Sequence, residues 1–207
     1  YVQGSSWSSL QSKLDALAFA MRPELGNVAI CFDERPDRQW IGMFAGDIDQ
    51  EPIGNGAIQF TARFLCPAGV AESVEEEEQE EEIDESPMSI TVPTEGAIGG
   101  TTYALPVWLL KNTDSTPLSA ITIANTTTAE TITVTHAVAE NAYVRIDTAR
   151  EIIEYSTDGE AWTNIMASRS NTNKKFPRLA PRIANSISVT GFAAGELTVT
   201  YRARYHR

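Results

Sequence analysis

The sequence has little of what catalytic and metal sites are built from. It contains only two histidines, His136 and His206, and two cysteines, Cys31 and Cys66, at no spacing typical of metal ligands. A His-rich metal site would need both histidines to converge. We therefore expect no metal, no cofactor and no catalytic residues, and we predict that the protein is not an enzyme.

Other signatures of enzymes and membrane proteins are also missing. The sequence has no phosphate-binding glycine motif, no Gly-x-Ser-x-Gly, and no apolar run near the roughly 20 residues of a membrane-spanning helix. It has no signal-peptide pattern and no disulfide-rich pattern, which is compatible with synthesis in a reducing cytoplasm. A glycan-cleaving enzyme with two paired carboxylates stays open as an alternative, because the sequence offers many acids.

Charge is distributed very unevenly along the chain. The formal net charge is −12, and residues 72–85 alone contain ten acidic residues and no basic one. From Arg169 onward the balance reverses, with eight lysines and arginines against the single acid Glu196. An acidic segment and a basic end in one chain indicate charge-complementary contacts between copies or domains. The candidate contact residues are Arg202, Arg204, Glu75, Glu76, Glu77 and Glu78.

The first third of the sequence predicts one amphipathic helix and several strands. Apolar residues recur at steps of three and four from Trp7 to Met21, and Pro23 follows as a helix terminator. Alternation then predicts three strands, over residues 27–33, 39–48 and 57–65. Residues 68–87 contain the acidic run and cannot bury enough apolar surface to offset the entropy of ordering, so we predict an acidic linker or projecting loop there.

The remainder of the sequence predicts an all-β sandwich. Short alternating segments recur at roughly ten-residue spacing, with turn signals between them, as in sandwich domains. They cover residues 105–110, 120–125, 131–136, 142–147, 151–155, 162–166, 186–190 and 197–205. Trp108 and Trp162 are candidate platforms on which a sugar ring could stack, so a carbohydrate-binding module that recognises surface glycans is the alternative function.

A series of structural motifs follows one order along the chain. The first part contains the helix Leu10–Leu17, the strand Val28–Phe32, the turn Pro36–Arg38 before Trp40, and the segment Phe60–Pro67. The second part contains Tyr103–Pro106, Ala142–Asp147, the turn Ser156–Gly159, Phe176–Pro181, Asn185–Ile187 and the closing strand Leu197–Tyr205. In this order, more than in residue identity, the sequence resembles the siphophage distal tail protein family over nearly its whole length.

The resemblance implies a mainly β fold in two domains. Residues 1–67 would form an N-terminal β-rich ring-forming domain with one amphipathic helix, and residues 88–197 a C-terminal galectin-like β-sandwich, with the acidic linker between them. In the family the last strand returns to the first domain, which would join residues 198–205 to it; alternation alone would keep that strand in the sandwich. The family also has strands ahead of its helix, which this sequence lacks, so the ring interface is expected to be incomplete. Arg182 replaces a glycine of a family turn, so we expect that turn to be reshaped, because a positive φ is costly for other residues.

The resemblance also implies a function. Members of the family are structural virion proteins that form a ring hub, expected to be hexameric, joining the tail tube to the adsorption apparatus at the tail tip. The implied partners are other copies of the chain, the tail tube protein, and hub, fibre or tape-measure proteins. DNA would be only passing cargo, and no membrane is involved. The implied location is the virion tail tip, after assembly in the host cytoplasm.

Overall fold

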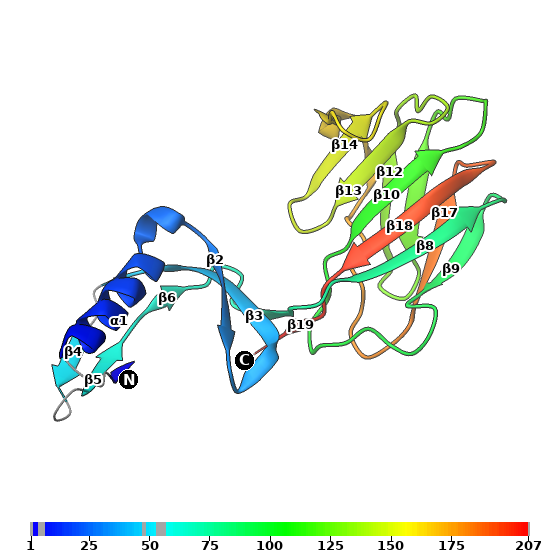
Figure 1. Cartoon of the computed structure of the whole chain (residues 1–207). Coiled ribbons are helices and arrows are strands. Elements are labelled where there is room, and N and C mark those ends of the chain that lie inside the picture. The colour runs from blue at the N-terminus through cyan, green and yellow to red at the C-terminus, as the bar shows by residue number, and fades with distance from the viewer. Residues whose placement is uncertain (1, 4–6, 47–48, 53–56, 207) are drawn as a thin grey trace. The chain divides into compact units, whose positions relative to one another are not determined.

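The computed structural model describes residues 2–3, 7–46, 49–52 and 57–206, and most of its regular structure is strand (Figure 1). This confirms the mainly β expectation. Contacts within the chain divide it into two compact units, Tyr1–Ala71 with Arg207, and Glu72–His206. No helix among the described residues is both long enough and apolar enough to cross a membrane.

The first unit contains the expected helix and small antiparallel sheets. Helix α1 (Trp7–Ala20) turns Leu10 inward, at 1% exposure, and leaves Leu14 half-buried. A short 3-10 turn, η1 (Pro23–Leu25), follows the helix. One sheet has the order β1-β5-β4, formed by Val2–Gln3, Ala57–Thr61 and Asp49–Pro52. In the other, β3 (Arg35–Phe44) pairs with β2 (Val28–Phe32) and β6 (Phe64–Leu65).

Four details of the first unit differ from the sequence prediction. Strand β4 was not predicted. A short strand, β1, precedes the helix. Strand β3 begins at Arg35, earlier than expected, because Arg35 pairs with Phe32 and leaves a tight hairpin between them. The strand expected over residues 57–65 is divided into β5 and β6. Residues 47–48, at the end of the strand expected over 39–48, lie outside the described residues.

The second unit is a sandwich of two antiparallel sheets. The six-stranded sheet has the order β15 (Thr163–Asn164), β14 (Ile152–Ser156), β13 (Tyr143–Asp147), β10 (Val107–Asn112), β18 (Gly195–Tyr201) and β8 (Glu77–Ile83). The five-stranded sheet has the order β16 (Arg169–Lys174), β12 (Glu130–Val134), β11 (Ile121–Asn125), β17 (Asn185–Thr190) and β9 (Met88–Val92). Alternate side chains of both sheets fill one core, in which Trp108, Ile123 and Val199 are fully buried. The strands predicted from alternation are present, except that the strand expected over residues 162–166 is reduced to the two residues of β15, and Met166 begins the 3-10 helix η2 (Met166–Ser168). Strands β8, β9 and β16 were not predicted.

The acidic run is a strand of the sandwich, not a linker. Strand β8 pairs with β18 along its whole length, from Glu77 opposite Tyr201 to Ile83 opposite Gly195. Ile83 is 1% exposed and belongs to the core. The composition argument failed because β8 lies at a sheet edge, where charged side chains remain in water and also block association with other strands. The boundary between the two units lies before this strand, at Ala71–Glu72.

Gln79 ties this acidic edge to the opposite sheet. Its side-chain amide donates to the Thr91 carbonyl oxygen at 2.9 Å and accepts from the Thr94 N–H at 3.1 Å. The Gln79 side chain thus joins the edge strands β8 and β9. This contact was not predicted from the sequence, because only the acidic residues of this segment were considered there.

The C-terminal strand is divided between two positions. Residues 195–201 form β18, between β10 and β8 in the sandwich, as alternation predicted for Thr198–Tyr201. Residues Arg204–Tyr205 form the short strand β19, which lies outside the two sandwich sheets and pairs with β7 (Ala71–Ser73). That the end of the chain belongs to the first domain stays a prediction. The Arg204 carbonyl oxygen accepts from the Thr101 N–H at 2.8 Å.

The turn at Arg182 keeps a left-handed backbone without a glycine. Arg182 has φ 62°, and its N–H donates to the Ile98 carbonyl oxygen at 2.8 Å. The bond to Ile98 and the surrounding loop hold a backbone conformation that costs on the order of 1 kcal/mol for a side-chain-bearing residue. That the turn as a whole is reshaped relative to the family stays a prediction.

The place of β8 in the core predicts a stability difference between neighbouring residues. Ile83→Ala should lower the free energy of unfolding by about 2–5 kcal/mol, because it leaves a cavity in a packed core. Glu82→Ala, at an exposed position of the same strand, should change it by less than about 0.5 kcal/mol. Urea titration of both variants measures the difference. Equal, small losses would show that the acidic segment is not part of the core.

Candidate functional site

The basic residues predicted to contact a partner are bound within their own unit. Arg202 lies 3.6 Å from a Glu76 carboxylate oxygen, measured from Nε, and its Nη1 donates to the carbonyl oxygens of Ser73, at 3.1 Å, and Val74. Arg204 Nε lies 3.2 Å from a Glu72 carboxylate oxygen. The complementary charges seen in the sequence therefore meet within one copy, close to where the two ends of the second unit come together.

The remaining predicted acids are not gathered around these arginines. Glu75, Glu77 and Glu78 are exposed. Burial, helped by the negative charge of Glu77, raises the pKa of the Tyr201 phenol on the neighbouring strand. Whether these glutamates and arginines also contact a partner stays a prediction.

The two tryptophans differ from each other. Trp108 is 0% exposed, so it cannot offer a ring to a sugar, and the sequence prediction for this residue is wrong because its parity points into the core. Trp162 is half-buried, with the Arg145 guanidinium carbon 4.1 Å from its ring centroid. Glu154 holds this arginine by two hydrogen bonds, of 3.0 and 2.7 Å. A role of Trp162 as a platform stays a prediction, with one ring face already covered by Arg145.

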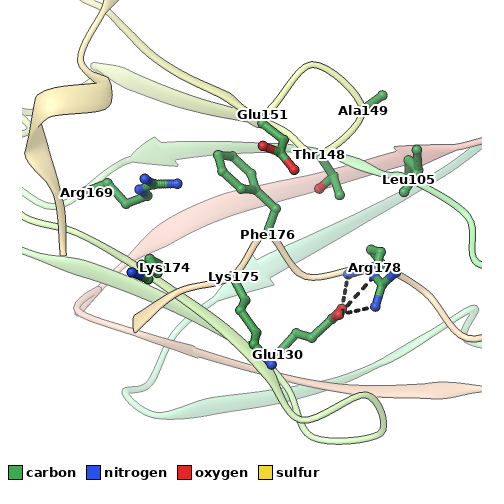
Figure 2. A pocket seen from close by; sticks show the side chains of 10 residues that line it. All are labelled: Leu105, Glu130, Thr148, Ala149, Glu151, Arg169, Lys174, Lys175, Phe176 and Arg178. Atoms are coloured by element: carbon green, nitrogen blue, oxygen red, sulfur yellow. Dashed lines mark hydrogen bonds and ion pairs between the residues drawn. The ribbon is translucent and has the colours of Figure 1, made fainter. Parts of the chain in front are cut away.

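A second charged site was not predicted: an open pocket of about 620 Å³ between the two sheets (Figure 2). The turn that joins β13 to β14 forms one wall, and β12, β16 and the segment after β16 form the other. Its lining residues are Leu105, Glu130, Thr148, Ala149, Glu151, Arg169, Lys174, Lys175, Phe176 and Arg178. Four of these are basic and two are acidic, so the pocket has an excess of positive charge.

One ion pair forms the base of this pocket. The Glu130 carboxylate accepts from the Arg178 Nε at 2.9 Å and from the Arg178 backbone N–H at 3.0 Å. Burial acts to raise the pKa of the Glu130 carboxyl, but the hydrogen bonds and the charge of Arg178 outweigh burial and hold that pKa below its usual value. The same contact raises the pKa of the Arg178 guanidinium, which also lies 4.4 Å from the centroid of the Tyr103 ring.

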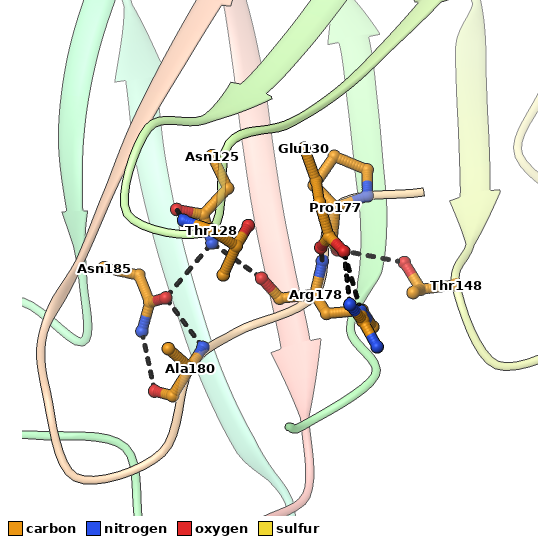
Figure 3. A network of polar contacts seen from close by, with 8 residues as sticks. All are labelled: Asn125, Thr128, Glu130, Thr148, Pro177, Arg178, Ala180 and Asn185. Carbon is orange, nitrogen blue, oxygen red and sulfur yellow. Dashed lines mark hydrogen bonds and ion pairs between the residues drawn. The ribbon is translucent and has the colours of Figure 1, made fainter. Parts of the chain in front are cut away.

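A network of buried amides fixes the loop that carries Arg178 (Figure 3). The Asn125 amide donates to the Arg178 carbonyl oxygen at 2.6 Å and to the Asn185 side-chain oxygen at 3.1 Å. The Asn185 side-chain oxygen accepts from the Ala180 N–H at 2.7 Å, and the Asn185 side-chain nitrogen donates to the Ala180 carbonyl oxygen at 3.0 Å. The Phe176–Pro181 and Asn185–Ile187 motifs are therefore structural, and they position one side of the pocket.

The site has the chemistry of a binding surface. His136 packs edge-on against Tyr155, 4.7 Å between centroids, and does not line the pocket. Within the described residues, no group of three or more His, Cys, Asp or Glu side chains is arranged to hold a metal. Arginine and lysine side chains around an open pocket are suited to bind carboxylates or phosphates. The sequence signal for this pocket was the basic stretch after Arg169, but nothing in it showed which bases converge.

The Glu130–Arg178 pair predicts a pH-dependent stability. The pKa of the Glu130 carboxyl is lower in the folded than in the unfolded protein, so the ionised carboxylate stabilises the fold. This stabilisation is fully present above the unfolded-state pKa near 4.5 and is lost as the pH falls through the folded-state pKa. Glu130→Gln should therefore lower the free energy of unfolding at pH 7 by about 1–3 kcal/mol, and the deficit relative to wild type should shrink below pH 4.5. Urea titrations across pH 3–7 (about one unit apart) test this; a deficit independent of pH would contradict it.

Comparisons with known proteins identify the fold. No family model and no curated protein matches the sequence. Among solved structures, the chain is similar to SPP1 Dit (gp 19.1), described as a paradigm of the hub adsorption apparatus in phages that infect Gram-positive bacteria. The TM-score is 0.68 at 13% sequence identity, and the match covers 96% of this chain and 73% of SPP1 Dit. The chain thus has the fold of a phage hub adsorption protein along nearly all of its length.

Proposed function

We propose that the protein is a structural component of a phage tail, a distal tail protein that forms a ring hub between the tail tube and the tail-tip adsorption apparatus. The observation that carries the proposal is the likeness to SPP1 Dit across 96% of the chain, including both units. The absence of a nucleophile–histidine arrangement around the described pocket is compatible with a structural role.

The surface of the first unit supports assembly into a ring. Several large apolar side chains there are exposed, at fractions of 45 to 64%: Phe19, Leu25, Phe32 and Leu65. One of them, Phe32, lines an apolar hollow of about 430 Å³ together with Ile30, Trp40, Phe64 and Cys66. Exposed apolar surface of this kind is typical of an interface between proteins. In the proposed hexamer, neighbouring copies cover it.

The proposed assembly assigns different tasks to the two units. The first unit forms the ring, through which DNA passes as cargo, and contacts the tail tube protein. The second, a galectin-like sandwich, offers a docking surface to hub, fibre or tape-measure proteins. The protein would be located at the virion tail tip after assembly in the host cytoplasm.

Mass and symmetry of the purified protein test the proposal. Light scattering and electron microscopy should show rings with six-fold symmetry. A monomer at all concentrations, with clear binding on a glycan array, would instead support the alternative of a carbohydrate-binding module.

The exposed apolar residues predict where the ring can be broken. Phe32→Glu and Leu65→Glu should shift the protein from rings to smaller species, because a buried interface cannot accept an unpaired charge. Ile183→Glu is the matched control: Ile183 is 50% exposed, as Phe32 is, but belongs to the second unit. Light scattering measures the mass, and circular dichroism confirms folding. Rings that survive both first-unit substitutions would contradict the proposed interface.

A further inference from the structure

Three cations at the pocket have no acidic partner in the part of the chain that the structure describes. Arg178 is bound to Glu130, but no carboxylate among the described residues lies within ion-pair distance of Arg169, Lys174 or Lys175. Both lysines are exposed, at the end of β16 and directly after it. Apart from the Glu130–Arg178 pair, the pocket is thus lined by three cations and one acid, Glu151, so its net charge is positive and an anionic ligand can approach it.

The pocket is better suited to carboxylates than to sugar rings. Phe176, its central aromatic residue in Figure 2, is 8% exposed, and the Arg169 guanidinium carbon lies 5.9 Å from its ring centroid. A sugar needs an open aromatic face, which this buried ring does not provide. Lysine and arginine side chains bind carboxylates directly.

The second unit also has an acidic surface, whose exposed carboxylates have no basic partner among the described residues. Glu78, Glu80 and Glu82 alternate along β8, are exposed, and have no cation within ion-pair distance among the described residues. Beside them lies an open hollow of about 510 Å³, to which Glu80, Glu82 and Glu196 contribute. Two acids of the hollow are bound: Glu196 to Lys111 at 3.2 Å, and Glu81, which accepts from the Gln79 amide at 2.8 Å. The acidic edge therefore offers carboxylates and space for an incoming basic side chain.

These two surfaces lie at opposite edges of one sandwich. Strand β8 ends the six-stranded sheet next to β9, to which Gln79 links it, whereas β16 ends the five-stranded sheet at the far side from β9. Figure 1 shows β8 and β9 together at one edge and β14 at the other. Because the surfaces are on opposite edges, they cannot meet within one copy, but they can meet between copies placed side by side.

We infer that the pocket with Arg169, Lys174 and Lys175 docks the acidic strand β8 of a second copy, so that adjacent sandwiches join head to tail. Contacts of this heterologous type repeat in one direction and close into a ring when the rotation allows. The inference rests on the proposed ring and adds a second, electrostatic contact between the sandwiches of neighbouring copies. The apolar surface of the first unit would supply a separate contact.

Charge reversal on each edge tests this contact. Lys174→Glu/Lys175→Glu and Glu80→Lys/Glu82→Lys should each weaken ring assembly by about tenfold or more, because attraction becomes repulsion. An equimolar mixture of the two variants should recover assembly, since each reversed pocket then meets a reversed strand. Glu140→Lys/Glu160→Lys, two exposed acids that line neither the basic pocket nor the acidic hollow, is the matched control and should assemble as wild type does. Sedimentation velocity in low and high salt measures the ring fraction, and thermal melting confirms folding.

The outcomes separate this inference from the proposed function. Rings that form equally in every variant would overturn the inference and leave the ring hub standing. A wild-type monomer in all conditions would overturn both. If charge reversal of the lysines prevents folding, Lys174→Gln/Lys175→Gln tests the same contact by neutralisation. A synthetic peptide with the sequence of residues 74–83 tests the occupant of the pocket. If the peptide binds the wild-type pocket but every variant assembles into rings as wild type does, the pocket binds an acidic segment of another protein. That result would overturn the assignment to a second copy.

Discussion

The second unit depends on the pairing of β10 with β18. Their facing residues, Trp108 with Val199 and Leu110 with Leu197, are at most 1% exposed and lie at the centre of the sandwich core. Strand β18 then positions β8 on one side, and β10 positions β13 and its turn on the other. Both the acidic edge and one wall of the basic pocket therefore take their places from this central pair, because strand pairing transmits register across a sheet.

Hydrogen bonds to buried polar side chains determine the shape of the pocket as much as apolar packing does. Glu130 is 7% exposed and Asn125 and Asn185 at most 1%, and each is bound by well-placed partners. A buried charge or amide without such partners would be strongly destabilising, so these groups restrict the loop to one conformation. The result is a neutralised ion pair beside two exposed lysines that have no acidic partner among the described residues.

The two units differ in how they are stabilised. The sandwich has a continuous core from its two sheets, whereas among the described residues of the first unit few side chains, such as Leu10 and Ile58, are buried. Its large apolar residues lie instead at the surface, which suits a unit that is completed by neighbouring copies. Under the proposed function, this difference separates an assembly unit from a self-sufficient docking unit.

By itself the sequence determined the mainly β class, the helix from Trp7 and most sandwich strands, because periodicities of 3.6 and 2 record which side of an element is apolar. It did not determine the role of the acidic run: that depended on a single buried residue, Ile83, and on a neighbour more than a hundred residues away, β18. Nor did it show that Arg202 and Arg204 meet acids of the same unit, or that Glu130 and Arg178 form the base of a pocket. Charge composition identifies which residues could pair, but only the tertiary structure brings particular side chains within hydrogen-bonding distance.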